Sequence, residues 1–170
     1  MTAVIRPARS EEEIRLAHRL EAACYSPELA ASPEAFLYRW RTYPDYFLTA
    51  WEGERLVGLA CGVRTDAEDC SDVGIKKLHG GSQDGRKLCV LSVAVDESRR
   101  GGGLGAKLLA AIVERAKRGG LAEVLLMCQS GLVRWYEANG FRPTGLIHDE
   151  HGGVEWHDMI MKLTEERLPG

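Results

Sequence analysis

The feature that most limits what this chain can fold into is one run, residues 88–109, in which an apolar strand leads through a glycine cluster into a helix. The strand part, Leu88–Val95, is a continuous series of apolar and β-branched residues, which predicts a central strand covered on both faces. The apolar residues from Leu104 to Val113 have helical spacing. The first N–H groups of such a helix lack intrahelical partners and its dipole is positive at that end, so this order of elements predicts an anion-binding cradle.

The glycines of this run can be compared with three known phosphate-binding patterns. A P-loop requires Gly, four residues and then Gly-Lys-Ser/Thr, and no spacing in the chain provides it. A Rossmann fingerprint fits Gly101, Gly103 and Ala106 only loosely, and the run lies past the midpoint of the chain, after several other strands. The third pattern, Arg/Gln-x-x-Gly-x-Gly/Ala, is met in full by Arg100, Gly103 and Gly105. The alternative interpretation of this run is a glycine-rich turn that binds no ligand.

Composition excludes several classes of function. The chain has 170 residues and a formal net charge of -3, with a pI near 6.0, which argues against nucleic acid as a partner because a phosphate footprint requires a basic face. No apolar run is long enough to span a membrane and no signal peptide is visible, so a cytoplasmic protein without a membrane partner is expected. The cysteines are odd in number and lack C-x-x-C spacing, which predicts reduced, structural thiols. They are Cys24, Cys61, Cys70, Cys89 and Cys128.

The hydrophobic pattern predicts one α/β domain over residues 1–170, with a mixed, mainly antiparallel sheet of about seven strands and about four flanking helices. Residues 65–86 contain Gly, Asp, Ser and Lys without periodicity, which predicts a long mobile loop that is a candidate lid. His148–His151 resemble metal ligands by composition, but their place between two strands and before two glycines favours a polar hairpin turn, and no metal is expected. Strands are expected at residues 4–6, 46–51, 55–64, 88–95, 121–128, 141–147 and 154–163, and helices at 11–23, 33–41, 104–118 and 132–139.

The glycine pattern and the order of elements resemble the GNAT acetyltransferase superfamily, in which this loop holds the pyrophosphate of acetyl-CoA. Tyr136, Gly140 and Phe141 also reproduce that superfamily's Tyr-x-x-x-Gly-Phe ending. The resemblance implies a GNAT-like fold with acetyl-CoA as cosubstrate. Because its pantetheine arm carries amide groups, it can pair with exposed strand backbone as a pseudo-strand. The expected cofactor-binding residues are Val93, Ala94, Val95, Arg100, Gly101, Gly102, Gly103, Leu104, Gly105 and Ala106.

Further segments resemble one group within the superfamily, the arylalkylamine (serotonin) N-acetyltransferases. They are Glu21–Pro27, Ala31–Glu34, Leu78–Gly81, Leu126–Cys128 and Trp156–Met159, in that order along the chain. This resemblance implies a primary amine as the acceptor.

Attack of an amine on a thioester requires a neutral amine, a polarised carbonyl and a proton for the departing thiolate. The superfamily places its general acid on the helix that contains Tyr136, and a phenol with a pKa of about 10 is a suitable donor. The alternative for Tyr136 is a structural role, as an aromatic core residue packed beside Trp135. Leu91, Met127 and His79 are candidate substrate contacts.

The residue that deprotonates the amine cannot be carried over from the family. Serotonin N-acetyltransferases have two histidines on the strand before the glycine loop, where this chain has Cys89 and Leu91, or Lys87 and Cys89 in a shifted register. Cys89 is a candidate nucleophile for a two-step transfer, although a buried cysteine is usually a small hydrophobe. Glu21 is a candidate contact for a cationic amine if its helix borders the cleft.

The sequence therefore predicts an acetyl-CoA-dependent N-acetyltransferase that acts on a small primary amine by direct attack in a ternary complex, as a monomer or homodimer. Two alternatives stay open at this point. One is an acyl-CoA-binding sensor without catalysis on the same fold, and the other is a protein or peptide N-acetyltransferase.

Overall fold

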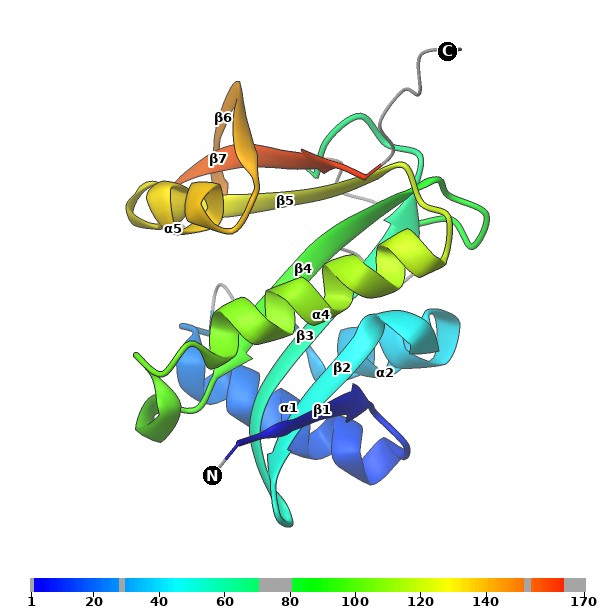
Figure 1. Cartoon of the computed structure of the whole chain (residues 1–170), viewed down its shortest axis with the longest axis vertical. Coiled ribbons are helices and arrows are strands. Elements are labelled where there is room, and N and C mark those ends of the chain that lie inside the picture. Colours follow the sequence, from blue (N-terminus) through cyan, green and yellow to red (C-terminus); the bar gives the residue numbers. More distant parts are fainter. Residues whose placement is uncertain (1, 28–29, 71–80, 152–153, 164–170) are drawn as a thin grey trace.

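Seven strands form one mixed sheet in the computed structural model, which describes residues 2–27, 30–70, 81–151 and 154–163 (Figure 1). Their order across the sheet is β1-β2-β3-β4-β5-β7-β6. All neighbouring strands are antiparallel except β4 and β5, which confirms the predicted mixed, mainly antiparallel sheet. The strands are β1 (Val4–Pro7), β2 (Phe47–Glu52), β3 (Arg55–Thr65), β4 (Lys87–Val95), β5 (Glu123–Gln129), β6 (Arg142–His151) and β7 (Val154–Lys162).

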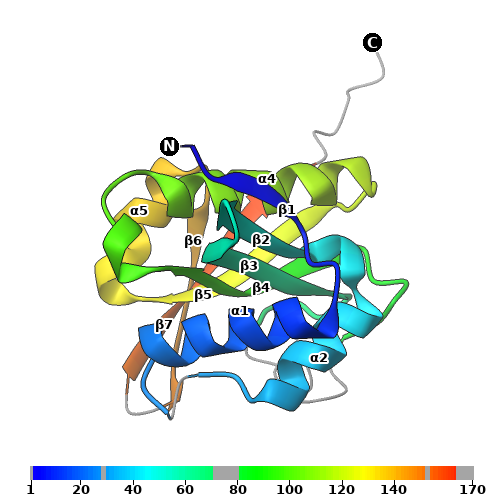
Figure 2. The same ribbon diagram turned by 90° about the horizontal axis from the view of Figure 1, so that it is seen from below.

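Four α-helices flank the sheet within the described residues, as the sequence predicts. The side chains of Ser10 and Ser32 cap α1 and α2 by accepting hydrogen bonds from the third N–H of each helix. Figure 2 shows α1 and α2 on one face of the sheet and α4 on the other. The helices are α1 (Glu11–Cys24), α2 (Pro33–Thr42), α4 (Leu104–Arg118) and α5 (Val133–Ala138).

The sheet separates two apolar cores, which fix the helices on its faces. Along β3, Leu59 and Cys61 pack in the cluster that includes α1 and α2. Ala60 and Val63 of the same strand pack in the cluster that includes α4. Because successive side chains of a strand point to opposite faces, this one strand anchors both layers.

The parallel pairing between β4 and β5 is short. It joins Lys87–Cys89 to Glu123–Leu125 and then stops, whereas β5 stays paired with β7 along its whole length, Glu123–Gln129. The two strands therefore diverge toward α5, as Figure 1 shows. The second half of β4 consequently has a sheet partner on one edge only.

A β-bulge lies in β4 at the place where this divergence begins. The pairing with β3 passes from Ser92 to Val90 and leaves Leu91 without a partner. Gly62 lies opposite on β3, where a Cβ would be only 2.6 Å from the main-chain oxygen of Cys89, so no larger residue fits. Such a bulge bends the strand and turns its main-chain groups away from the regular ladder.

The structure corrects the expectation that β4 is covered on both faces. The strand is central, and Leu88 and Cys89 are fully buried. Leu91, Val93 and Val95 are only half-buried, since they follow the point at which β5 diverges. The apolar run therefore reflects an open edge in its second half.

The structure bears on two further predictions about loops. It corrects one of them, and it describes only part of the other loop. His148–His151 do not form a hairpin turn, because β6 continues through His151 and pairs it with Val154. The described parts of the predicted loop at 65–86 contain no helix or strand beyond Thr65, where β3 ends. His79 lies outside the described residues.

The prediction that all five cysteines are reduced is wrong. Cys70 and Cys89 form a disulfide with a Cα–Cα distance of 6.4 Å, whereas Cys24, Cys61 and Cys128 are free. The bond fastens the segment after β3 to the middle of the sheet. It also removes Cys89 as a candidate nucleophile, since a disulfide sulfur carries no thiolate.

We expect the variant Cys70→Ala to lower the free energy of unfolding by about 3 kcal/mol, because a disulfide that closes a loop of this size restricts the unfolded chain. The measurement is urea unfolding with and without a dithiol reductant. Reductant should bring the wild type to the level of Cys70→Ala and leave that variant unchanged. Cys128→Ala, which removes a buried free thiol, is the control and should keep the wild type's response to reductant. Equal stability of the wild type with and without reductant would contradict the structural role of the bond.

Candidate functional site

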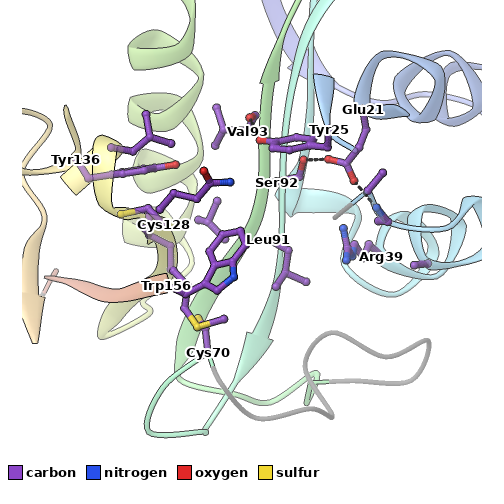
Figure 3. A pocket seen from close by; sticks show the side chains of 18 of the residues that line it. Glu21, Tyr25, Arg39, Cys70, Leu91, Ser92, Val93, Cys128, Tyr136 and Trp156 are labelled. Carbon is purple, nitrogen blue, oxygen red and sulfur yellow. Dashed lines mark hydrogen bonds between the residues drawn. The ribbon is translucent and has the colours of Figure 1, made fainter. Parts of the chain in front are cut away.

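A cavity of about 490 Å³ lies where β4 and β5 separate (Figure 3). Its floor is formed by Val90–Val93 of β4 and Leu126–Gln129 of β5. One wall comes from α1, α2 and the loop between them, and the opposite wall from α5 and β7. The cavity therefore joins elements from both faces of the sheet, which a gap between paired strands makes possible. The principal wall residues are Glu21, Tyr25, Arg39, Leu132, Tyr136 and Trp156.

Glu21 is a buried carboxylate in the α1 wall, with 3% of its surface exposed. The Ser92 hydroxyl donates a hydrogen bond to Oε1, and the Ala31 N–H donates to Oε2 at 3.0 Å. His18, one turn earlier, lies 2.9 Å from the Ala31 carbonyl through Nε2. Helix α1 thus holds both the loop that precedes α2 and the middle of β4.

Arg39 is the cation of the same wall and is 7% exposed. Its Nη1 donates to Cys61 Sγ at 3.7 Å, and its guanidinium lies over the Phe36 ring, 5.6 Å from the centroid. Burial raises the pKa of Cys61 to about 11, so this sulfur is a neutral thiol at pH 7. In the described part of the chain Arg39 therefore has a weak neutral acceptor and no carboxylate partner.

The open edge of β4 is partly covered by residues at the end of α1. The Asp96 N–H donates to the Val57 carbonyl of β3 at 2.9 Å, and by strand alternation the main-chain groups of Val93 and Val95 point to the other edge. There, the Tyr25 hydroxyl donates to the Val93 carbonyl at 2.8 Å and Cys24 Sγ to the Val95 carbonyl at 3.5 Å. Any ligand that pairs with this edge has to share or replace these two donors.

Tyr136 closes the cavity from the side of α5. Its ring makes edge contacts with Trp135 and Phe141, at centroid distances of 4.8 and 5.9 Å, and its hydroxyl points into the cavity (Figure 3). No described residue hydrogen-bonds to this hydroxyl. Burial raises its pKa well above the usual value for a phenol. Tyr136 is thus both a packed aromatic residue and a protonated group available to a ligand.

The glycine cluster lies at the exposed start of α4. Gly101 and Gly103 have φ angles of 83° and 84°, in the left-handed region that favours glycine. Asp96 and Arg99, which flank the turn, are paired with Arg55 and Glu52, so the strand end and the turn are held in place. The N–H groups that open α4 are consequently presented to solvent in a fixed loop.

Arg100 is exposed and forms no ion pair within the described residues, so its charge is available to an anion. A Cβ on Gly105 would lie 3.5 Å from the Trp135 ring, an ordinary contact. The pattern Arg/Gln-x-x-Gly-x-Gly/Ala allows alanine in place of Gly105, and the available space agrees with that.

The structure brings four of the predicted site residues together in the cavity. Leu91, Val93, Met127 and Tyr136 line the cavity. Ala94 instead is paired with Leu59 and lies in the core beneath α1, so it is Val93 and Val95 that offer main-chain groups at the open edge.

Two wall residues were not among the predicted site residues. Tyr25 lies within the segment Glu21–Pro27, which resembles the family, but its role at the edge of β4 appears only in the structure. Arg39 belongs to no local pattern, because it reaches the cavity only through the packing of α2 on the sheet. No histidine lines the cavity among the described residues. In the same part of the chain no group of His, Cys, Asp and Glu side chains is arranged to hold a metal ion.

Comparison with known proteins gives a family and a fold. A profile of the acetyltransferase (GNAT) family matches residues 14–141. A search of curated proteins found no match. Over the described residues, no helix is long and apolar enough to cross a membrane.

Three solved structures illustrate the similarity of fold. Ard1 from Thermoplasma volcanium is 19% identical, with a TM-score of 0.75 and coverage of 97% of this chain and 100% of that one. The loading GNATL domain of CurA from Lyngbya majuscula is 16% identical, with a TM-score of 0.83 and coverage of 96% and 98%. YncA from Salmonella typhimurium, with its cofactor acetyl-CoA, is 20% identical, with a TM-score of 0.65 and coverage of 100% and 99%.

The raised pKa of Tyr136 predicts how the protein behaves in alkali. Ultraviolet difference titration of the folded protein should show the same tyrosinate signal near pH 10 for the wild type and for Tyr136→Phe, because Tyr136 is still protonated there. A folded-state pKa above the unfolded value stabilises the fold below about pH 10, and this contribution is lost as the pH rises further. The wild type should therefore lose unfolding free energy more steeply than Tyr136→Phe above about pH 10. Loss of one tyrosine's signal near pH 10 in the variant would contradict the burial of this hydroxyl.

Proposed function

Because this chain belongs to the acetyltransferase (GNAT) family, we propose that it transfers the acetyl group of acetyl-CoA to a small primary amine, by direct attack in a ternary complex. The observation that carries the proposal is the cavity between β4 and β5. Its lining includes the open edge of β4 and the half-buried Tyr136, whose raised pKa keeps the hydroxyl protonated at neutral pH. Its volume is that of a small-molecule site, which favours a small acceptor over a peptide.

The residues that would hold acetyl-CoA fit its chemistry. The N–H groups at the start of α4, with Arg100 beside them, suit a pyrophosphate. The main-chain groups of Val93 and Val95 suit the amides of the pantetheine arm, which would pair with them as an added strand. Leu91, which the bulge leaves out of the β3 register, lies next to that edge and can turn an N–H toward a carbonyl oxygen.

Acetyl-CoA supplies a thioester, and Tyr136 supplies the proton for the sulfur that leaves. The raised pKa of Tyr136 keeps its proton in place throughout the neutral range. It also makes the phenol a weaker acid, but the same burial raises the proton affinity of a thiolate that forms beside it. The two effects oppose each other, so transfer from oxygen to sulfur stays accessible.

Replacement of Tyr136 by phenylalanine tests both the acetyltransferase function and the role of Tyr136 as the general acid. We expect Tyr136→Phe to lower turnover tenfold or more, while acetyl-CoA still protects the variant against thermal unfolding. The measurement is the release of the CoA thiol with a panel of amines. Tyr46→Phe, which changes a buried tyrosine outside the cavity, is the matched control and should keep the wild-type rate.

An unchanged rate in Tyr136→Phe would remove this residue from the mechanism. Absence of CoA release with every amine in the panel would instead support an acyl-CoA sensor. Release only with peptides would support the acetylation of protein N-termini or lysines.

The glycine loop allows a separate test of cofactor binding. Gly103 and Gly120 stand at opposite ends of α4 with φ angles of 84° and 73°, and a Cβ would meet no atom at either position. Replacing either by alanine should cost about 1–2 kcal/mol of unfolding free energy, because both force a side chain into the left-handed region. Only Gly103→Ala should also weaken acetyl-CoA binding, by about tenfold or more, since it alone disturbs the N–H groups that face the phosphates. Isothermal titration calorimetry measures this, and equal affinities of the two variants would refute the assigned loop.

A further inference from the structure

Two buried side chains of opposite charge, Glu21 and Arg39, lie in the same wall of the cavity without an ion-pair partner in the described part of the chain (Figure 3). Among the described lining residues, Glu21 is the only one with a carboxyl group and Arg39 the only one with a basic side chain. A buried charge is costly unless it is paired. This arrangement therefore calls for a ligand that carries both charges.

Each of the two groups has hydrogen-bonding capacity left over. The Glu21 carboxylate accepts one hydrogen bond on each oxygen, from Ser92 and from the Ala31 N–H, and retains a lone pair on each. Arg39 has five N–H donors and uses one on a weak sulfur acceptor. Glu21 comes from α1 and Arg39 from α2, and both line the same wall of the cavity.

We propose that the acceptor is an α-amino acid, whose ammonium group binds Glu21 and whose carboxylate binds Arg39. Such a zwitterion pairs both buried charges at once, through charge-assisted hydrogen bonds. A simple amine pairs only Glu21 and leaves the guanidinium without an anion. Leu91, Met127 and Trp156 provide apolar surface in the rest of the cavity, which favours an apolar side chain on the amino acid. This proposal deepens the acetyltransferase function and rests on it.

The reaction balances with the groups that line the cavity. The ammonium loses one proton to solvent by way of the Glu21 carboxylate that it contacts. The nitrogen lone pair then forms the C–N bond as the C–S bond breaks. Tyr136 donates its proton to the sulfur and recovers one from the new amide nitrogen. The products are the N-acetyl amino acid, CoA as its thiol and one released proton.

The same contacts account for release of the product. An amide nitrogen has no positive charge, so the N-acetyl amino acid loses the attraction to Glu21 that its precursor had. Only the contact of its carboxylate with Arg39 remains. Substrate is therefore bound at two charged points and product at one.

Matched pairs of acceptors test the proposal in the wild type. Phenylalanine is compared with phenethylamine and with phenylalanine methyl ester, and leucine with isopentylamine, by CoA release at saturating acetyl-CoA. We expect kcat/KM to be at least about tenfold higher for each amino acid than for the partner that lacks the carboxylate charge. Amines or esters that are used as well as the amino acids would overturn the proposal. They would leave the N-acetyltransferase function intact, whereas no release with any acceptor would refute that function itself.

Variants assign the two charges separately. Arg39→Met should raise KM for the amino acids about tenfold or more and leave the amines nearly unchanged, and Arg39→Lys should recover part of the loss. Glu21→Gln should raise KM for both classes, and acetyl-CoA affinity should stay at the wild-type level in all three. Arg41→Met, on the same helix but exposed and paired with Glu11, is the control and should behave as wild type. If Arg39→Met affects amino acids and amines equally, Arg39 only supports the fold and the carboxylate site is refuted. If Arg39→Met does not fold, the comparison of amino acid with methyl ester decides.

Discussion

Three residue pairs join β4 to β5, and the point at which this pairing stops determines what the rest of the molecule can do. A continuous parallel ladder would satisfy both edges of β4 and leave no space in the sheet. Because β5 follows β7 instead, the second half of β4 keeps an open edge and half-buried apolar side chains. The bulge at Leu91 adds to this divergence, and Gly62 is the residue that permits the bulge. The cavity is thus a property of strand pairing, and the helices around it only provide its walls.

The gap also explains why charged groups can lie so deep in a small protein. Glu21 is held from two directions, by a hydroxyl on β4 and by an N–H in the loop before α2. Removing it would release the loop as well as the charge, so its contribution to structure and its contribution to binding are linked. Arg39 differs, because its contacts are a thiol and an aromatic ring. Neither compensates a full charge, so of the two groups Arg39 gives the stronger reason to propose an anionic ligand.

Much of the fold could be predicted from the sequence because its signals are local. The serine caps of α1 and α2, the helical spacing after Leu104 and the glycines with positive φ each depend on neighbours in the chain. Of the site, the positions of Tyr136 and Met127 in the cavity lining agree with expectations that came from the family motif and from the strand bordering the cleft, whereas their roles stay predictions. Arg39 could not be found, since its approach to the cavity depends on how α2 packs on β3. The disulfide of Cys70 and Cys89 was not predicted for a similar reason. A separation of 19 residues has no local signature, and the prediction of reduced thiols relied on the odd number of cysteines and the absence of C-x-x-C spacing.

The open edge of β4 links the two halves of the site. Tyr25 and Cys24 donate hydrogen bonds to the carbonyls of Val93 and Val95, which protects an exposed edge from pairing with another strand. A pantetheine arm that pairs with the same carbonyls competes with these donors. Tyr25 lies one turn beyond Glu21 on the same stretch of chain, so displacement of its hydroxyl acts directly on the acceptor wall. A change at this edge of β4 and the shape of the wall that contains Glu21 are therefore coupled through the end of α1, and such a coupling acts equally in both directions.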